Sequence, residues 1–219
     1  MQSAEARSRK SGAFRVGVFV AHPDDETLWA GGTLLLHPEW ACRVMTLCRG
    51  SDPDRSPKFR RALKELGAQG EMGDLDDGPD QHPLPGFAVE ETVSRLAGDR
   101  RFDLVLTHSP QGEYTRHLRH EETGRAVLSL WRRGGLHTNS LWFFAYGDDN
   151  RENLPRAILG AHHRMLLPPR IWARKYIILT GIYGFRRGSF EARTTPRAEA
   201  FWVYGSPERA AVLAEDAIP

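Results

Sequence analysis

Near its start the chain reads Phe14-Arg15-Val16-Gly17-Val18-Phe19-Val20-Ala21, followed at once by His22-Pro23-Asp24-Asp25-Glu26. The first part is apolar and rich in β-branched residues, which is typical of a strand buried on both faces of a parallel sheet. Because proline disfavours helical geometry at the residue before it, we expect the strand to end at His22. The acidic residues then favour the start of a helix, where negative charge complements the helix dipole. The segment predicts a strand, a turn and a helix.

The same alternation continues along the chain. Further strands are expected at residues 43–48, 72–75, 102–108 and 141–146, and helices at 58–66, 86–97 and 121–131. This order predicts an α/β fold: a Rossmann-like, doubly wound, mostly parallel sheet in three αβα layers, forming a single domain over residues 13–219. Beyond Gly147 the pattern loosens. Residues 177–179 and 200–204 are candidate strands, and we expect the last third, about residues 150–219, to complete or cap the site.

Composition excludes several classes of protein. The 219 residues include 30 basic and 28 acidic side chains, interleaved along the chain, so no basic surface for nucleic acid is expected. Two cysteines cannot build a disulfide framework, which favours reduced thiols and a cytoplasmic location. The apolar run at residues 14–21 is much shorter than the roughly 20 residues of a membrane span. Residues 1–12 are predicted to be a disordered basic tail.

Two loops at predicted strand ends carry groups that can bind metal. In doubly wound sheets, ligands bind beyond the carboxyl ends of the strands, where the strand order reverses. The residues there are His22, Asp24 and Asp25 in the first loop, and His108, Glu113, Tyr114, Arg116, His117 and His120 in the loop after the strand at 102–108. Acidic residues after proline also suit a helix start, and a lone HxxH pair also suits a solvated helix turn. Their joint position at strand ends favours three ligands to a divalent metal with an open fourth position.

At these residues the chain resembles a known family. Ala21–Leu28, followed by Gly31-Gly32-Thr33-Leu34, is similar to the AHPDDE signature of the LmbE-like, or PIG-L, zinc-dependent N-deacetylases. Residues 103–108, with His117-Leu118-Arg119-His120, resemble the second motif of that family, HxxH. The resemblance extends roughly over residues 14–130, and a segment at 199–204 is similar to the family's last strand.

The resemblance implies an LmbE-like fold and a role for each matching residue. His22, Asp25 and His120 would hold Zn²⁺, or another divalent metal, Asp24 would be the general base, and His117 would be a charged group that stabilises the oxyanion or protonates the leaving amine. The implied reaction is hydrolysis of a linear amide. It would remove an N-acetyl or other N-acyl group from an amino sugar such as N-acetylglucosamine, in a glycoconjugate or small-molecule glycoside. The partner expected is that small molecule, and the oligomeric state, a homo-oligomer included, is left open.

The chain also departs from the family pattern. Members commonly have HPDH where this chain has Arg119 in the third position, and often a glutamate where it has Lys58. These positions bear on substrate handling and on the surroundings of His120. Substrate-binding candidates are Arg49, Asp77, Tyr114 and Arg116.

Two other functions remain as hypotheses. Two histidines and one carboxylate also describe the ligand set of non-heme iron redox enzymes. A catalytically silent domain that binds carbohydrate or nucleotide on the same fold is the third reading. Gly31 and Gly32 come too late after the first strand for a dinucleotide-binding G-x-G-x-x-G turn.

Overall fold

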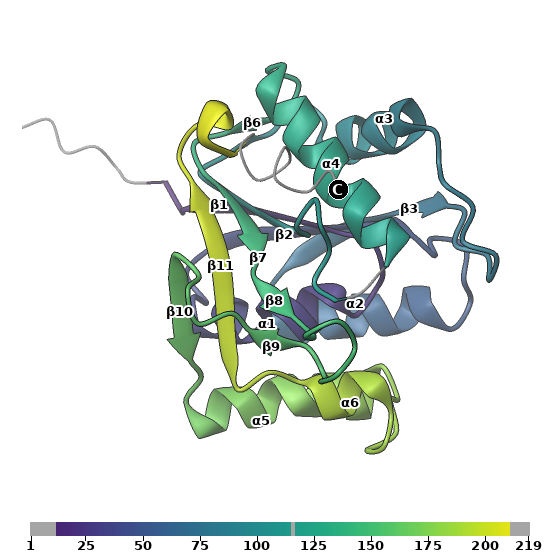
Figure 1. Ribbon diagram of the computed structural model, residues 1–219, viewed down its shortest axis with the longest axis vertical. Coiled ribbons are helices and arrows are strands. Elements are labelled where there is room, and N and C mark those ends of the chain that lie inside the picture. The colour runs from purple at the N-terminus through teal and green to yellow at the C-terminus, as the bar shows by residue number, and fades with distance from the viewer. Residues whose placement is uncertain (1–11, 115–116, 211–219) are drawn as a thin grey trace, which may run out of the picture.

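The computed structural model describes residues 12–114 and 117–210, so Arg116 and the predicted tail, apart from Gly12, lie outside the described residues. Its centre is a seven-stranded sheet (Figure 1). The strands in spatial order are β10 (His163–Leu166), β11 (Ala198–Tyr204), β7 (Leu141–Phe144), β5 (Leu104–Thr107), β1 (Arg15–Val20), β2 (Ala41–Cys48) and β3 (Gln69–Leu75). Neighbouring strands from β7 to β3 are parallel, whereas β11 is antiparallel to both β7 and β10.

Strand β1 lies inside the parallel part of the sheet, as its apolar sequence predicts. Every residue of it except Arg15 is buried. Alternate side chains enter two separate clusters, Val18 on one face and Phe19 on the other. Phe19 is opposite Met45 of β2 and Thr107 of β5. Because these strands run in the same direction, the loops that follow β1 and β5 meet at one edge of the sheet.

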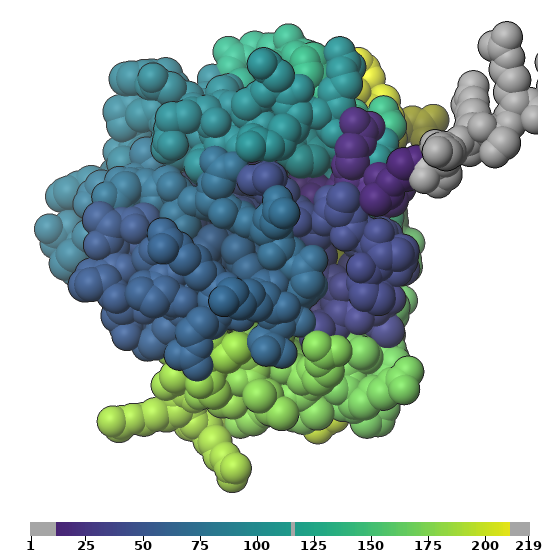
Figure 2. All heavy atoms as spheres, turned by 180° about the vertical axis from the view of Figure 1, so that it is seen from behind, coloured from purple at the N-terminus to yellow at the C-terminus, as the bar shows by residue number. Residues whose placement is uncertain are grey.

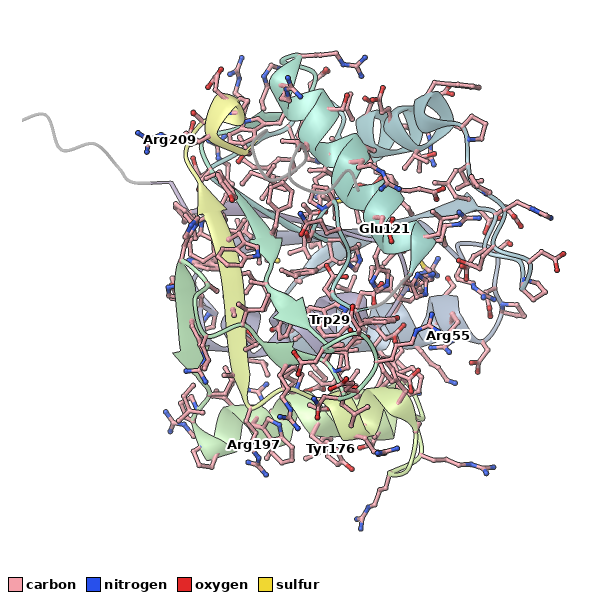
Figure 3. All side chains as sticks on the ribbon, viewed as in Figure 1. Trp29, Arg55, Glu121, Tyr176, Arg197 and Arg209 are labelled. Atoms are coloured by element: carbon pink, nitrogen blue, oxygen red, sulfur yellow. The ribbon has the colours of Figure 1, made fainter. Side chains whose placement is uncertain are left out.

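Helices cover both faces of the sheet (Figure 1). The helices on the face of Val18 are α1 (Asp25–Leu36), α2 (Arg55–Leu66) and α5 (Pro169–Ile177). Those on the face of Phe19 are α3 (Gly86–Ala97) and α4 (Leu118–Arg132). Seen from behind, the segment of α5 and α6 (Phe190–Thr194) forms a layer beneath α2 (Figure 2). Trp29 is fully buried above this layer, and Arg197 lies at its outer edge (Figure 3). The predicted three-layer, doubly wound fold is confirmed.

The prediction of a strand at residues 177–179 is wrong. Ile177 ends α5, and Ile178–Ile182 form a π-helical turn, η1. Ile171, Ile178 and Leu179 are buried, whereas Ile177 is 61% exposed. Burial therefore follows the period of a helix that packs with one face. The short apolar run at 177–179 fits a strand and one face of a helix equally well, so the sequence alone did not distinguish them.

Other boundaries differ from the expected ones. The strand expected at 102–108 is divided into β4 (Arg101–Phe102) and β5, because Asp103 between them accepts hydrogen bonds from the backbone N–H and side chain of Arg15. Strand β4 pairs with β6 (His137–Thr138) outside the main sheet. Helix α4 begins at Leu118, before the expected residue 121, so the HxxH motif lies at its first turn.

The last third of the chain completes the sheet and attaches it to α1. Glu199 of β11 is fully buried and accepts hydrogen bonds from Gly32 N–H (2.7 Å), Thr33 N–H (2.6 Å) and Lys175 Nζ (2.6 Å). A Cβ atom on Gly32 would lie 2.4 Å from Leu167, so glycine is required there by close packing. A small sheet of β8 (Tyr146–Gly147) and β9 (Arg156–Ala157) lies in the same region.

Within the described ranges, no helix is both long enough and apolar enough to cross a bilayer.

Candidate active site

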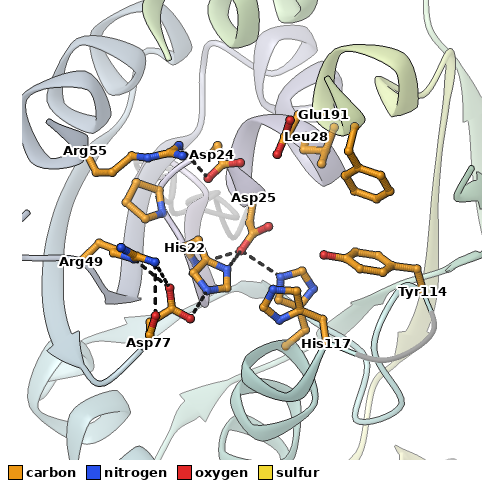
Figure 4. A pocket seen from close by; sticks show the side chains of 13 residues that line it. His22, Asp24, Asp25, Leu28, Arg49, Arg55, Asp77, Tyr114, His117 and Glu191 are labelled. Atoms are coloured by element: carbon orange, nitrogen blue, oxygen red, sulfur yellow. Dashed lines mark hydrogen bonds and ion pairs between the residues drawn. The ribbon is translucent and has the colours of Figure 1, made fainter. Parts of the chain in front are cut away.

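A pocket of about 250 Å³ opens where the loops after β1, β2, β3 and β5 meet (Figure 4). The chain segments that supply its walls are widely separated in sequence. Its lining residues are His22, Pro23, Asp24, Asp25, Leu28, Arg49, Arg55, Asp77, Tyr114, His117, His120, Phe190 and Glu191. The structure therefore brings together the predicted ligands, the predicted catalytic residues and, apart from Arg116, the substrate-binding candidates, whereas His108 and Glu113 are not among the lining residues.

The tight turn after β1 points the two aspartates in different directions. Asp24 has φ 130°, a backbone conformation that residues other than glycine rarely adopt. The buried Glu26 stabilises it by accepting a hydrogen bond from Asp24 N–H (3.0 Å), and Tyr183 Oη in turn donates to Glu26 (2.8 Å). Asp25 is then the first residue of α1.

Asp25 lies between two imidazoles at distances that suit a metal site. Its Oδ2 atom is 3.2 Å from His22 Nδ1 and 3.4 Å from His120 Nε2. In a tetrahedral site with bonds of about 2.0–2.1 Å, donor atoms lie roughly 3.3 Å apart. A nitrogen of His22 and a nitrogen of His120 also lie within 4.8 Å of each other. This spacing fits one cation shared by the three side chains.

Hydrogen bonds on the far side of each imidazole fix its tautomer. His22 Nε2 donates to Asp77 Oδ1 (3.1 Å), and His120 Nδ1 donates to Glu113 Oε2 (2.7 Å). With the proton on the far nitrogen, the nitrogen that faces Asp25 carries a lone pair and can act as a ligand. Among the described residues, the buried His120 Nε2 has no hydrogen-bond partner, which is the condition expected of an atom that binds a metal.

Two overlapping groups also have ligand atoms within 4.8 Å of one another: His22, His117 and His120, and Asp25, His108 and His120. His108 Nε2 lies 3.4 Å from Asp25 Oδ2. However, this nitrogen accepts a hydrogen bond from Ala21 N–H (3.0 Å), and His108 Nδ1 donates to Glu113 (2.8 Å). Because its lone pair is already used, His108 is a poorer ligand than His22.

Burial and charge separate the pKa values of the two aspartates. Burial, together with the neighbouring charge of Asp25, raises the pKa of Asp24 well above its usual value. Burial also acts to raise the pKa of Asp25, but His120 and His108 hold it well below the usual value. Arg55 Nη1 lies 3.7 Å from Asp24 Oδ1. These directions favour an ionised Asp25, as a metal ligand requires, and make Asp24 the carboxyl group better suited to exchange a proton.

His117 lies beside the two candidate ligands. Its ring centroid is 4.8 Å from that of His22 and 4.1 Å from that of His120. Burial, followed by the charges of His120 and His22, lowers the pKa of His117 to about 3. This lowered pKa favours the neutral imidazole, whereas the family resemblance implies a charged group at this position. One reason is that its buried Nδ1 has no hydrogen-bond partner within the described ranges, and the third residue of the motif is Arg119 rather than aspartate.

The substrate-binding candidates lie on opposite sides of this group (Figure 4). On one side, Arg49 Nε donates to Asp77 Oδ2 (2.8 Å). On the other, the ring of Tyr114 lies 5.2 Å from that of Phe190. Arg116 lies outside the described residues, so its position is not compared.

Several site residues were missed in the sequence. Glu113 was counted among the groups that can bind metal but not as a hydrogen-bond partner of His120, although a carboxylate close to an HxxH motif is a usual partner of a metal-binding histidine. Arg55, Phe190 and Glu191 were not singled out. The last two come from α6, in a part of the chain where no motif is visible, and no signal in the sequence could have found them.

Comparisons with known proteins agree with this geometry. The fold and site define an α/β protein with a candidate metal centre at the switch point of its sheet. The model of the PIG-L family, described as GlcNAc-PI de-N-acetylase, matches residues 17–131, more than half of the chain. The chain belongs to the PIG-L (LmbE-like) family. No curated protein matches it significantly.

Solved structures share the fold at low sequence identity. The N,N'-diacetylchitobiose deacetylase of Pyrococcus horikoshii has a TM-score of 0.64 and 13% identity, over 87% of this chain and 84% of that one. A zinc-inhibited form of teicoplanin deacetylase Orf2 has a TM-score of 0.62 and 17% identity, over 88% and 98%. The 4-carboxy-2-hydroxymuconate hydratase GalB of Pseudomonas putida has a TM-score of 0.57 and 16% identity, over 87% and 95%. The last of these shows that the fold also occurs in a hydratase.

Proposed function

We propose that this protein is a metal-dependent N-deacylase that removes an N-acetyl or other N-acyl group from an amino sugar. His22, Asp25 and His120 would hold Zn²⁺ or another divalent metal. The observation that carries the proposal is the position of Asp25 Oδ2, 3.2 Å from His22 Nδ1 and 3.4 Å from His120 Nε2, with both tautomers set for binding. The family, whose description names a de-N-acetylase, supports the reaction class.

The residues around the ligands supply proton transfer. A bound divalent metal would lower the pKa of a water molecule and polarise the amide carbonyl. Asp24 then takes a proton from the water as its oxygen attacks the carbonyl carbon, and returns that proton to the amine when the C–N bond breaks. The products are a carboxylic acid and a free amine. A raised pKa suits Asp24 to both steps, because the carboxylate must accept the proton and then release it.

His117 would stabilise the oxyanion that forms at the carbonyl oxygen. A neutral imidazole has one N–H group, which is sufficient to donate a hydrogen bond to that oxygen. Its ring lies against those of His22 and His120, so it is within reach of a group bound between them.

The two sides of the pocket support an acylated amino sugar as substrate. Arg49, Arg55 and Asp77 make one side charged, which suits the hydroxyl groups of a sugar. On the opposite side Leu28, Tyr114 and Phe190 supply apolar surface beside Glu191, and this surface suits the acyl group (Figure 4). Two structural relatives are also deacetylases, one of a chitobiose derivative and one named for teicoplanin, which supports the same class of reaction.

An assay of product release tests the proposal. The purified protein, loaded separately with Zn²⁺, Mn²⁺ or Fe²⁺, is incubated with a panel of N-acetyl- and N-acylglucosaminides, and carboxylate and free amine are measured. We expect both products in equal amounts, with and without oxygen. Inertness of every metal-loaded form towards the panel would contradict the proposal. A dependence of the reaction on oxygen would instead support a redox enzyme. In a separate incubation, hydration of 4-carboxy-2-hydroxymuconate would support a hydratase. A cytoplasmic location stays a prediction.

A further inference from the structure

Arg119, which occupies the third position of the HxxH motif, is buried, and its guanidinium bonds to residues other than the candidate metal ligands. Its side chain is only 2% exposed. The guanidinium donates to the backbone oxygens of Asp76 (Nε, 2.7 Å) and His82 (Nη2, 2.8 Å), and to Glu122 Oε2 (Nη1, 2.6 Å). Two of these three hydrogen bonds therefore join α4 to one segment that is distant in the sequence.

That segment is the connection between β3 and α3, residues 76–84, which has no regular secondary structure. Its far end is fastened to the same helix, because Leu84 N–H donates to Glu122 Oε1 (2.8 Å). Arg119 and Glu122 thus form a buried pair that binds both ends of the segment. Within helix α4 this pair is adjacent to His120, one of the candidate ligands.

The segment carries Asp77 into the pocket. Asp77 Oδ1 accepts from His22 Nε2 (3.1 Å), and its Oδ2 accepts from Arg49 Nε (2.8 Å). Asp77 therefore contacts both a candidate ligand and a candidate substrate-binding residue. Its position depends on how the neighbouring residue Asp76 is held.

We propose that Arg119 is a positioning residue that sets the place of Asp77 relative to the metal site. The role of Asp77 in binding substrate rests on the proposed function, whereas the anchoring of residues 76–84 does not. Lysine cannot replace Arg119, because an ammonium group lacks the planar fork that reaches two carbonyl oxygens and a carboxylate at once. The aspartate common in the family could not make these bonds either, because an ionised carboxylate has no hydrogen-bond donor and the partners of Arg119 are all acceptors.

Steady-state kinetics of a double-mutant cycle test the link to Asp77. The variants are Arg119→Lys, Asp77→Asn and the double variant, assayed on a glucosaminide that the wild-type enzyme hydrolyses. We expect Arg119→Lys to raise KM about tenfold with kcat changed less than about threefold, and to have no further effect in the Asp77→Asn background. Effects that multiply in the double variant, or a fall in kcat alone, would overturn the proposal.

Hydrogen exchange tests the anchoring without any assay of activity. In Arg119→Lys, backbone amides of residues 76–84 should exchange at least about tenfold faster than in wild type, while those of β1 should not change. Arg132→Lys, at the exposed far end of α4, is the matched control and should leave exchange at 76–84 unchanged. If Arg119→Lys does not fold, Glu122→Gln weakens the same pair and should give a smaller increase. Unchanged exchange at 76–84 would refute the proposal, whereas inactivity of wild type with increased exchange would refute only the proposed function.

Discussion

Glu113 Oε2 accepts a hydrogen bond of 2.7 Å from His120 Nδ1, and both side chains are almost completely buried. The same oxygen accepts from His108 Nδ1 (2.8 Å), and Glu113 Oε1 accepts from Ser109 N–H (2.9 Å). One carboxylate therefore orients two imidazoles and leaves His120 Nε2 facing Asp25. This arrangement explains how a motif without the usual aspartate can still present His120 to a metal.

Replacing Glu113 with glutamine should weaken metal binding without abolishing it. His108 and His120 bond to one oxygen of Glu113 and Ser109 N–H bonds to the other. A glutamine has only one acceptor oxygen, and its NH₂ group faces either the two imidazoles or the Ser109 N–H, so the network loses hydrogen bonds and holds His120 less firmly. We expect Zn²⁺ affinity to fall about 10- to 100-fold, measured by competition with a chromophoric chelator. Asp103→Asn, a distant change at the surface pair with Arg15, is the control and should keep wild-type affinity. Equal affinity of the wild type and the Glu113→Gln variant would show that Glu113 does not orient His120.

Glu113 should also give the protein a distinctive dependence of stability on pH. Burial disfavours its charge, but His108 and His120 lower the pKa of Glu113 to about 2, from its usual value of 4.5. Since the folded state binds fewer protons, this contribution to the free energy of unfolding is complete above about pH 4.5 and is lost as pH falls towards about 2. Urea unfolding of chelator-treated protein from about pH 6 to about pH 3 should show a shallower loss in Glu113→Gln than in wild type. Parallel curves would contradict the assigned cause.

Replacing each of the two neighbouring aspartates with alanine should affect different properties: turnover for Asp24 and metal binding for Asp25. Asp24→Ala should keep one equivalent of metal and lose at least about 100-fold in kcat, because only the proton acceptor is removed. Asp25→Ala and His120→Ala should lose the metal itself. Metal content by mass spectrometry, measured beside turnover, separates the two outcomes. Equal loss of metal from all three variants would contradict the assigned roles.

Gly32 and Gly31 offer a matched test of packing between α1 and the last third of the chain. A Cβ atom at Gly32 would lie 2.4 and 2.5 Å from the two Cδ atoms of Leu167 and 2.9 Å from Glu199. At Gly31 the nearest atom would be Thr27 Cγ2 at 3.3 Å. We expect Gly32→Ala to lower the free energy of unfolding by about 1–3 kcal/mol, and Gly31→Ala to change it much less. Urea unfolding measures both, and similar values for the pair would argue against close packing at Gly32.

Local patterns were sufficient to predict the parallel part of the fold and the loops that carry the site. The run from Phe14 to Ala21 indicates a buried strand by itself, and Pro23 with the acidic residues after it marks the turn and helix. Parallel strands then bring the loops after β1 and β5 to one edge, so the meeting of His22 with His120 followed from topology. The strand proposed at 177–179 failed because a short apolar run fits either a strand or one face of a helix.

Contacts between distant segments could not be read in the same way. Nothing around Phe190 indicates that α6 forms a wall of the pocket, since that depends on how the chain returns after β10. The pair of Arg119 with Glu122 looks like an ordinary charge pair on a helix, and only the fold shows that it holds residues 76–84. Likewise, the burial that separates the pKa values of Asp24 and Asp25 is a property of the assembled site.

Anomalous X-ray diffraction at the zinc absorption edge, from crystals of the Zn²⁺-loaded protein, tests the metal site most directly. We predict one strong peak about 2.0–2.2 Å from His22 Nδ1, Asp25 Oδ2 and His120 Nε2. A peak bound by Asp25, His108 and His120 instead, or no peak within bonding distance of His22, would contradict the assignment on which the proposed reaction depends.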